Sequence, residues 1–351
     1  MTIAVVTPAI KREGALTLAK GVLSRIALMT NSLGPRIAIL FLLLSTLLLP
    51  TWAQSGYDFH QTLAVAPAQA VALDVTLANG DLEVLYSKDG EVSVTATGHD
   101  ANGTRLNEAF LKASLFLEQN GNHITLRQTS SAAYLQDRLH IRYRMDVPYR
   151  TEVISHVDRG TQTLSGIMGP VRATGGKCDV KASYLSKDVR IEVESGNLDL
   201  EVIGESVAAR TGRGNISGTR LAQGVNAESG DGDITLIVVG PSTATVKNGT
   251  GRIDATAIGS NFTGTTQAGE VHVKAEPRGN WRLNSVSGSI HIEMPPILKL
   301  NLIASTDSGL FQIDRDDIVE SVTDPHHLQQ QIKGGGLRVE AHTGSGNISI
   351  R

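Results

Sequence analysis

From about residue 147 onward, apolar and polar residues alternate in short stretches that end at a glycine and then begin again. These glycines recur at spacings of 18 to 21 residues, with one final gap of 37 residues. They are Gly176, Gly196, Gly214, Gly232, Gly251, Gly269, Gly288, Gly309 and Gly346. A period of this length predicts a β-solenoid, in which each repeat forms one coil and the coils stack on one another.

Apolar residues occupy four fixed positions around each glycine: two and four residues after it, and five and seven residues before it. The residues between them are mostly polar, which predicts two strands per coil with side chains pointing alternately inward and outward. Glycine suits the turn between the strands because it accepts a positive φ without a Cβ clash. The inward positions also hold Cys178, Phe262, Trp281 and Phe311. We expect these four side chains in the core.

Two segments depart from the repeat. Residues 314–336 interrupt it and are expected to form an inserted loop or degenerate coil, with a short helical piece near 328–333. Residues 54–146 show alternating strands separated by the turn signals Asn79-Gly80 and Asn120-Gly121, with one helical turn near 107–111. The sequence therefore predicts an all-β protein with an amino-terminal β region over 54–146 and solenoid repeats over 147–351.

The first 53 residues have the features of a secretory signal peptide. A 13-residue apolar run, Ile37–Leu49, follows Arg36 and precedes a small residue at Ala53. The run is shorter than the roughly 20 residues that cross a bilayer, so we expect cleavage before Gln54 rather than a membrane anchor. A start at Met29 is a second possibility, since it gives a signal of ordinary length. Either start predicts an exported protein located in the periplasm, at the cell surface or outside the cell.

Composition excludes some classes of function for this chain. The chain has 351 residues, 36 glycines, one cysteine and a net charge of -3. The first 53 residues contain five Lys/Arg and one Glu, so the remainder has 27 basic and 34 acidic residues, a net charge of -7. This balance argues against nucleic acid as a partner. A single cysteine excludes a disulfide within the chain and a cysteine-based zinc site.

The repeated pattern Ser-Gly-Asn/Asp-Ile-x-Leu, after a signal peptide and the step Val147-Pro148, resembles the bacterial putative-adhesin family of secreted β-solenoid domains. The resemblance covers about residues 54–351. It implies the solenoid fold and a role in surface interaction. The family has no established catalytic motif, so the resemblance transfers no site residues, and a shared fold does not by itself establish function.

Stacking brings outward residues of neighbouring coils together, about 4.8 Å apart. Asp254, His272 and His291 are expected to follow one another in such a ladder, a set that could ligate a divalent metal. Ladder side chains lie parallel rather than converging on one point, however, so a solvated polar face is the favoured interpretation. We therefore predict no metal and no cofactor.

Two groups of charged residues also follow from the alternation. His140, Arg142 and Arg144 share one face of a strand, and this basic face could contact anionic glycan or lipid headgroups. An ordinary solvated face is the alternative. A second ladder alternates in sign, which predicts ion pairs that fix the register of the coils. Its members are Arg172, Glu192, Arg210, Glu228 and Lys247.

Three functions remain open. The favoured one is a non-catalytic, exported β-solenoid that mediates surface interaction or adhesion through an unidentified glycan or envelope component. A purely structural envelope scaffold is the alternative. A polysaccharide-acting β-helix enzyme is less favoured, because such enzymes place carboxylates beside aromatic platforms, and every aromatic residue after 185 falls at an inward position. We also expect a sheet edge after the last strand that permits self-association.

Overall fold

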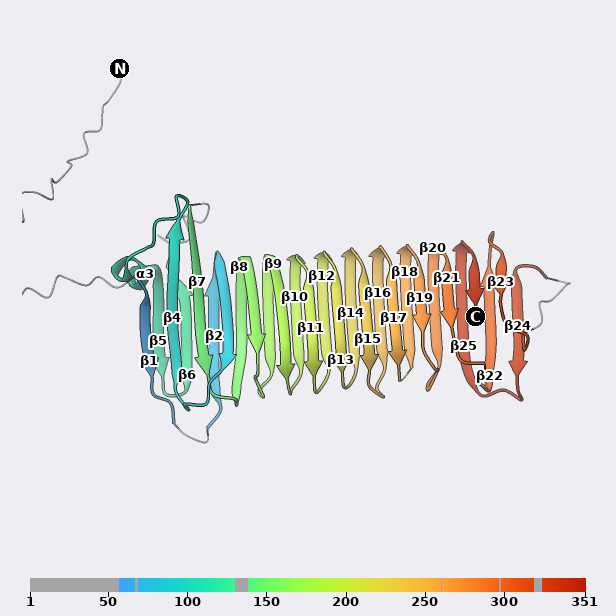
Figure 1. Cartoon of the computed structure of the whole chain (residues 1–351), viewed down its shortest axis with the longest axis horizontal. Helices are drawn as coiled ribbons and strands as arrows, with labels where there is room; N and C mark the ends of the chain where they lie inside the picture. The colour runs from blue at the N-terminus through green and yellow to red at the C-terminus, as the bar shows by residue number, and fades with distance from the viewer. Residues whose placement is uncertain (1–56, 67–68, 130–137, 260, 297, 319–323) are drawn as a thin grey trace, which may run out of the picture. The chain divides into compact units, whose positions relative to one another are not determined.

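Each regular coil consists of two short strands that meet at a glycine corner (Figure 1). The computed structural model describes residues 57–66, 69–129, 138–259, 261–296, 298–318 and 324–351. The predicted signal segment 1–53 and its cleavage site lie outside these residues. The first strands of the regular coils are β10 (Val189–Ser195), β12 (Val207–Arg213), β14 (Val225–Asp231), β16 (Ala244–Thr250), β18 (Phe262–Ala268) and β20 (Trp281–Ser287). The second strands are β11 (Leu198–Ile203), β13 (Ile216–Leu221), β15 (Ile234–Val239), β17 (Ile253–Ile258), β19 (Val271–Lys274) and β21 (Ile290–Glu293).

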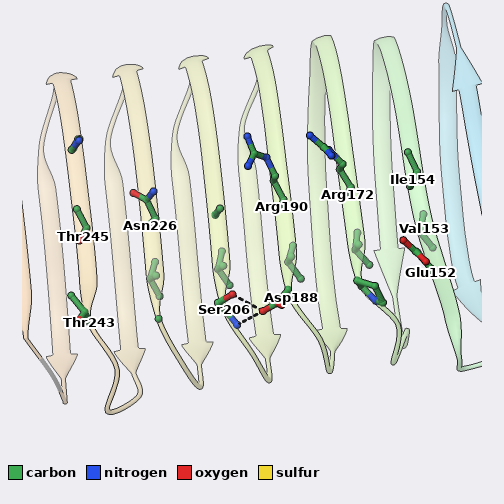
Figure 2. A pocket seen from close by; sticks show the side chains of 18 residues that line it. Glu152, Val153, Ile154, Arg172, Asp188, Arg190, Ser206, Asn226, Thr243 and Thr245 are labelled. Atoms are coloured by element: carbon green, nitrogen blue, oxygen red, sulfur yellow. Dashed lines mark hydrogen bonds between the residues drawn. The ribbon is translucent and has the colours of Figure 1, made fainter.

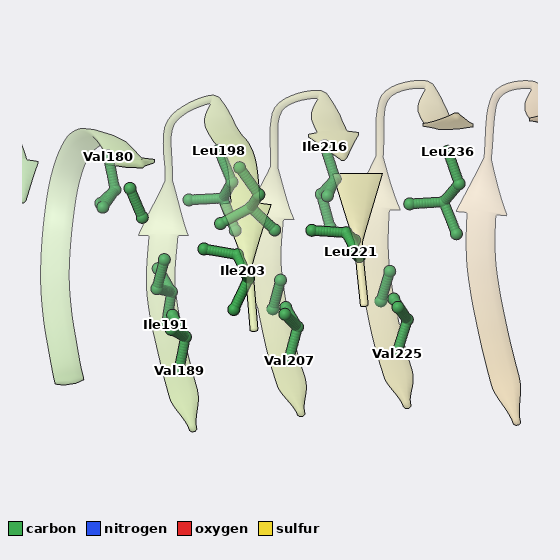
Figure 3. Close-up of a cluster of buried hydrophobic side chains, with 14 of the residues drawn as sticks. Val180, Val189, Ile191, Leu198, Ile203, Val207, Ile216, Leu221, Val225 and Leu236 are labelled. Carbon is green, nitrogen blue, oxygen red and sulfur yellow. The ribbon is translucent and has the colours of Figure 1, made fainter. Parts of the chain in front are cut away.

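Strands at the same place in successive coils pair in parallel, which produces two facing sheets. Apolar residues of both sheets fill the space between them, as Figure 3 shows for Val189, Leu198 and Ile216. Each of these side chains is at most 2% exposed. Burying a valine, leucine or isoleucine contributes roughly 1.5–3 kcal/mol, and stacking repeats this gain in every coil. The β-solenoid predicted from the sequence is confirmed.

The corner requires glycine because the coils stack closely there. Gly214 has a φ of 142°, and a Cβ added to it would lie 2.1 Å from the carbonyl oxygen of Gly196 in the previous coil. A side chain would therefore separate the two coils. The residue after the glycine braces the same corner: the Asn215 N–H donates to Oδ1 of Asn197 at 2.9 Å. This bond between successive coils explains why Asn or Asp often follows the glycine.

The first coils differ from the predicted registration. β8 (Thr151–Ser165) and β9 (Val171–Leu185) run unbroken through the corner, and Val189 pairs with Val171 rather than with Gly169. Gly196 therefore stacks on Cys178, not on Gly176. Cys178 is buried as expected, but it occupies the corner position of its coil. Burial raises the pKa of its thiol to about 11.

The amino-terminal end closes the core with antiparallel strands and a helix. β2 (Val71–Leu77) and β3 (Gly80–Tyr86) pair in parallel with the two halves of β8, so Asn79-Gly80 is a coil corner rather than a hairpin turn. Coil stacking thus already occurs within 54–146, and the predicted division at 146/147 stays a prediction. The surrounding elements are β1 (Phe59–Leu63), β4 (Val92–Asp100), α3 (Glu108–Ser114), β5 (Leu115–Asn120), β6 (His123–Gln128) and β7 (Leu139–Val147). The helical turn predicted near 107–111 is confirmed as α3, which Asn107 caps through a hydrogen bond to the Phe110 N–H.

The carboxyl-terminal coils do not stack in chain order. β20 pairs with β25 (Leu337–Ser345), and β25 pairs on its other side with β22 (Leu300–Thr306). Likewise β26 (Ile348–Ile350) lies between β21 and β23 (Phe311–Ile313). The last strand is therefore paired on both sides, and the open edge predicted after Arg351 is wrong. The 37-residue gap contains the second strand of the outer coil, the insertion with β24, and the first strand of the coil that lies between the outer coil and β20–β21.

The insertion between β23 and β25 contains a strand rather than a helix. β24 (His327–Ile332) pairs antiparallel with β22, so the helical piece predicted at 328–333 is wrong. The Arg315 side chain, 4% exposed, anchors the start of the insertion. It donates two hydrogen bonds to Asp317, at 2.9 and 2.8 Å, and others to the carbonyls of Met294 and Pro295. Within the described residues, no helix has the length and apolar character needed to cross a membrane.

Candidate functional site

A groove crosses the outer face of the sheet formed by the first strands of the coils (Figure 2). It has a volume of about 730 Å³, and residues of successive coils from β8 to β16 line it. The groove runs across the strands, so it follows the direction in which the coils stack. Its polar and charged lining includes Glu152, Arg172, Asp188, Arg190, Ser206, Asn226, Thr243, Thr245 and Lys247.

Short side chains in the middle of the face create the hollow. Ala208 lies between Arg190 and Asn226 in one row across the strands. Ser206 and Gly224 lie two residues before Ala208 and Asn226 and form the next row of the floor. Because outward side chains alternate along a strand, two adjacent rows of short residues leave an open depression between longer ones.

Two arginines stand side by side at one end of the groove. Strand register pairs Arg172 of β9 directly with Arg190 of β10, and Figure 2 shows both side chains extending in the same direction. Arg190 lies 3.6 Å from a carboxylate oxygen of Glu192. Within the described residues, Arg172 has no carboxylate within 4.0 Å. The site thus presents two neighbouring guanidinium groups. Among the described residues, their one ion pair with a carboxylate is the 3.6 Å contact between Arg190 and Glu192.

The acidic residues of the groove are placed differently. Asp188 lies on the row that continues to Ser206, and its Oδ1 accepts hydrogen bonds from the Ser206 hydroxyl at 2.5 Å and from the Ser206 N–H at 3.2 Å (Figure 2). Glu152 is on the same row, in β8. The carboxylate of Asp188 is therefore committed to the floor, whereas the arginine pair lies one alternation further along the strands.

The predicted ladder of Asp254, His272 and His291 forms as expected. Both register pairs are present, and the two imidazole rings meet edge to face with centroids 6.4 Å apart. The ring nitrogens of His272 contact carboxylates on either side: Nδ1 lies 2.9 Å from Asp254, and Nε2 lies 3.3 Å from Glu293. Hydrogen bonds from Lys274 and then from His272 lower the pKa of the Glu293 carboxyl.

This arrangement joins the ladder through hydrogen bonds instead of directing its ligand atoms at one point. Across the described residues, no group of three or more His, Cys, Asp or Glu side chains is arranged to hold a metal ion. Asp254 is additionally held by Arg252 at 2.9 Å. The ladder is thus a network of acid–base pairs, and the prediction that it binds no metal stays a prediction.

The predicted basic face is largely neutralised by its neighbours. His140 contacts Asp81 at 3.0 Å, Arg142 lies 3.5 Å from Glu83, and Arg144 makes a two-point contact with Asp146. The three basic side chains are each about half exposed. His140 and Arg142 also border a second hollow, together with His99 and Arg105. Since carboxylates lie beside all three predicted residues, their positive charge is largely compensated within the protein, and their role as an interaction face stays a prediction.

The predicted ladder of alternating charge is correct in part. Glu192 pairs in register with Arg210, Arg210 with Glu228, and Glu228 with Lys247. Arg172, however, sits in the next row beside Arg190, because the first coil is shifted by two residues from the predicted registration. Because of that shift, the predicted registration placed Arg172 opposite Glu192 and did not show that it lies beside Arg190. The signal was present in the 18-residue spacing between Cys178 and Gly196, which matches the later coils.

The chain is similar to one family of proteins and to several solved structures. The family described as Toastrack DUF4097 matches residues 70–351. A structure described as a putative cell adhesion protein from Clostridium sporogenes is 10% identical, with a TM-score of 0.21, over 84% of this chain and 98% of that protein. Putative adhesins from Bacteroides fragilis and Parabacteroides distasonis are 12% and 11% identical, with TM-scores of 0.31 and 0.32, over 84% of this chain and 97% of theirs. No curated protein matches the chain.

Proposed function

The chain belongs to the Toastrack DUF4097 family, and from this premise we propose that it is an exported, non-catalytic binding module of the cell envelope. In this proposal the groove over β8 to β16 is the surface that contacts a glycan or another envelope component. Export rests on the apolar run Ile37–Leu49 and its flanking residues.

The observation that supports binding is the construction of the groove from successive coils. Its residues lie on or next to strands that pair with neighbours on both sides, so the backbone positions from which its side chains project are set before a ligand arrives. A preformed site avoids part of the entropy cost of ordering loops on binding. A groove that extends across several coils can also contact several units of an extended ligand at once, which increases affinity through multivalency.

A groove-filling variant tests this proposal. Ala208→Trp places a large side chain in the hollow, and Ser217→Trp places the same side chain on the outer face of the opposite sheet in the same coil. We expect the unmodified protein and Ser217→Trp to bind bacterial cells and a subset of a glycan array, and Ala208→Trp to lose this binding. Thermal unfolding and circular dichroism check that both variants fold.

The alternative of a purely structural scaffold makes a different prediction. A scaffold binds neither cells nor glycans above background, and Ala208→Trp then behaves like Ser217→Trp. Fractionation of tagged protein tests export separately: recovery in the cytoplasm with residues 1–53 retained would overturn that part of the proposal.

A further inference from the structure

We propose that Arg172 and Arg190 form an anion clamp and that the groove takes an acidic polysaccharide, whose carboxylate or sulfate groups bind between the two guanidinium groups. This inference deepens the proposed function, because it rests on the groove being the binding surface. It identifies the class of ligand and the residues that select it.

The two arginines occupy an electrostatically unfavourable position. Equivalent side chains on paired strands lie about 5 Å apart, and like charges directly opposite each other destabilise a sheet. In the adjacent row the register places opposite charges together, as it does for Arg210 and Glu228. At Arg172 and Arg190 the register brings two cations together. An anion bound between them would relieve their repulsion.

The chemistry of the side chains selects the anion. A guanidinium presents a planar fork of donors that fits the two oxygens of a carboxylate or sulfate, and such charge-assisted hydrogen bonds are about twice as strong as neutral ones. Two adjacent forks can bind one anionic group from both sides, or two groups on successive units of a polymer. Lys247 supplies a further cation three strands away, about 14 Å along the groove.

The remainder of the groove favours sugar over protein or lipid. Beyond the arginines, the uncharged polar lining is Ser206, Asn226, Thr243 and Thr245, whose hydroxyl and amide groups can donate and accept hydrogen bonds with sugar hydroxyls. Glu152, Asp188 and Lys247 are the other charged lining residues, and small or apolar residues form the rest of the floor. Protein interfaces depend on buried aromatic or apolar anchors, and membrane contact requires a larger apolar face. Among the described residues that line the groove, none is aromatic, and Ile154 is the exposed large apolar side chain.

The test measures binding of the full chain to defined polymers. The probes are polygalacturonate for carboxylate, dextran sulfate for sulfate, unmodified dextran as the neutral polysaccharide, and polyglutamate as the acidic polypeptide. The variant is Arg172→Gln combined with Arg190→Gln, and the control is Arg210→Gln, which removes one charge from the adjacent row. All substituted positions are exposed, and thermal unfolding confirms folding.

We expect binding to polygalacturonate or dextran sulfate that weakens as salt concentration rises, with no binding to dextran. The double variant should lose about tenfold or more in affinity, and Arg210→Gln should stay within about twofold. Comparison of the two anionic polysaccharides tells carboxylate from sulfate. Equal affinity of the double variant and the unmodified protein would overturn the proposal, as would binding to dextran or tighter binding to polyglutamate.

Failure of this inference and failure of the proposed function are distinguishable. If cells and arrayed glycans bind in a manner that Ala208→Trp abolishes, but the double arginine variant binds them normally, the groove functions without the clamp. If the polyanions bind through the arginines while cells and arrayed glycans do not, the clamp exists and the proposed surface role is wrong.

Discussion

At the corners of several coils, a buried polar side chain donates a hydrogen bond to a backbone carbonyl of the neighbouring coil. Three residues before the glycine, Thr211 donates to the carbonyl of Gly196 at 2.9 Å, and Ser229 donates to Gly214 at the same distance. The same bond recurs at Asn248, Ser285, Thr306 and Thr343. Unpaired buried carbonyls are costly, so these residues are under a hydrogen-bonding constraint that their inward position alone would not predict.

One of these corner positions, three residues before the glycine, provides a matched control. The hydroxyl of Thr266 is buried at the equivalent place but has no hydrogen-bond partner among the described residues. Thr211→Val should lower the free energy of unfolding by about 1–3 kcal/mol, because it leaves the Gly196 carbonyl without its donor. Thr266→Val should be neutral or stabilising, since it removes a polar group that gains nothing. Equal losses in urea unfolding would contradict this account of the corner hydrogen bonds.

The buried thiol makes stability depend on alkaline pH. Burial raises the pKa of Cys178 from 9.0 to about 11, so between these values the unfolded thiol ionises while the folded thiol stays protonated. Ionisation of the unfolded state lowers the stability of the folded state as pH rises from about 9 to about 11, by on the order of 2 kcal/mol. Below pH 9 this contribution is fully present.

The measurement compares the unmodified protein with Cys178→Ala by urea unfolding at several pH values. Cys178→Ala is expected to be less stable at neutral pH because it leaves a cavity, but to lose less stability between pH 9 and pH 11. Parallel pH profiles for the two proteins would show that the thiol does not titrate in this way.

At the scale of elements, the turn after β23 depends on a single buried cation. Arg315 links Asp317 to carbonyls near the end of β21, and it thereby joins the insertion to the regular coils. The Arg315 hydrogen bond lowers the pKa of the Asp317 carboxyl, so this pair stabilises the fold above the ordinary pKa of an aspartate and loses that effect in acid.

Removal of this cation should loosen the outer coil. Arg315→Met is expected to lower the free energy of unfolding by about 1–3 kcal/mol, below the usual cost of breaking a buried pair because Asp317 is 25% exposed and can be solvated. Hydrogen exchange should accelerate in β23 and β24 before it does so in the regular coils. The exposed neighbour provides the control, and Asp316→Asn should leave both measurements unchanged.

At the scale of the whole molecule, the order of the coils in space differs from their order in the chain. The coil of β25 and β26 separates β20–β21 from β22–β23. The final 15 residues, Leu337–Arg351, therefore lie inside the stack. The outer coil therefore depends on pairing with residues far from it in the chain, and non-local pairings of this kind slow folding.

Truncation after Gly336 distinguishes this order from sequential stacking. In the observed order, β22 and β23 lose their inner neighbours, and we expect residues 300–318 to lose protection from hydrogen exchange and become sensitive to protease. The regular coils up to β18 should keep their protection. If 300–318 stayed protected in the truncated chain, the coils would be stacking in chain order.

The structure of a single coil follows from local patterns along the chain. The alternation of side chains assigned its two strands, the glycine its corner, and inward positions such as Phe262 and Trp281 its core, because each depends on residues close together in the chain. The groove and the arginine pair could not be predicted from such local patterns. They depend on register between coils, and the corner at Cys178 lacks the glycine that marks register elsewhere.

The order of the coils in the stack, by contrast, depends on contacts between residues far apart in the chain. All coils carry similar apolar stripes, so the sequence of β20 is compatible with more than one neighbour. In the structure, the neighbour of β20 on this side is β25. Register between coils likewise places Arg172 beside Arg190 and Ala208 in the hollow, since residues in different coils meet only when strand pairing aligns them. Local patterns thus fix the repeating unit, whereas the site arises from contacts between units.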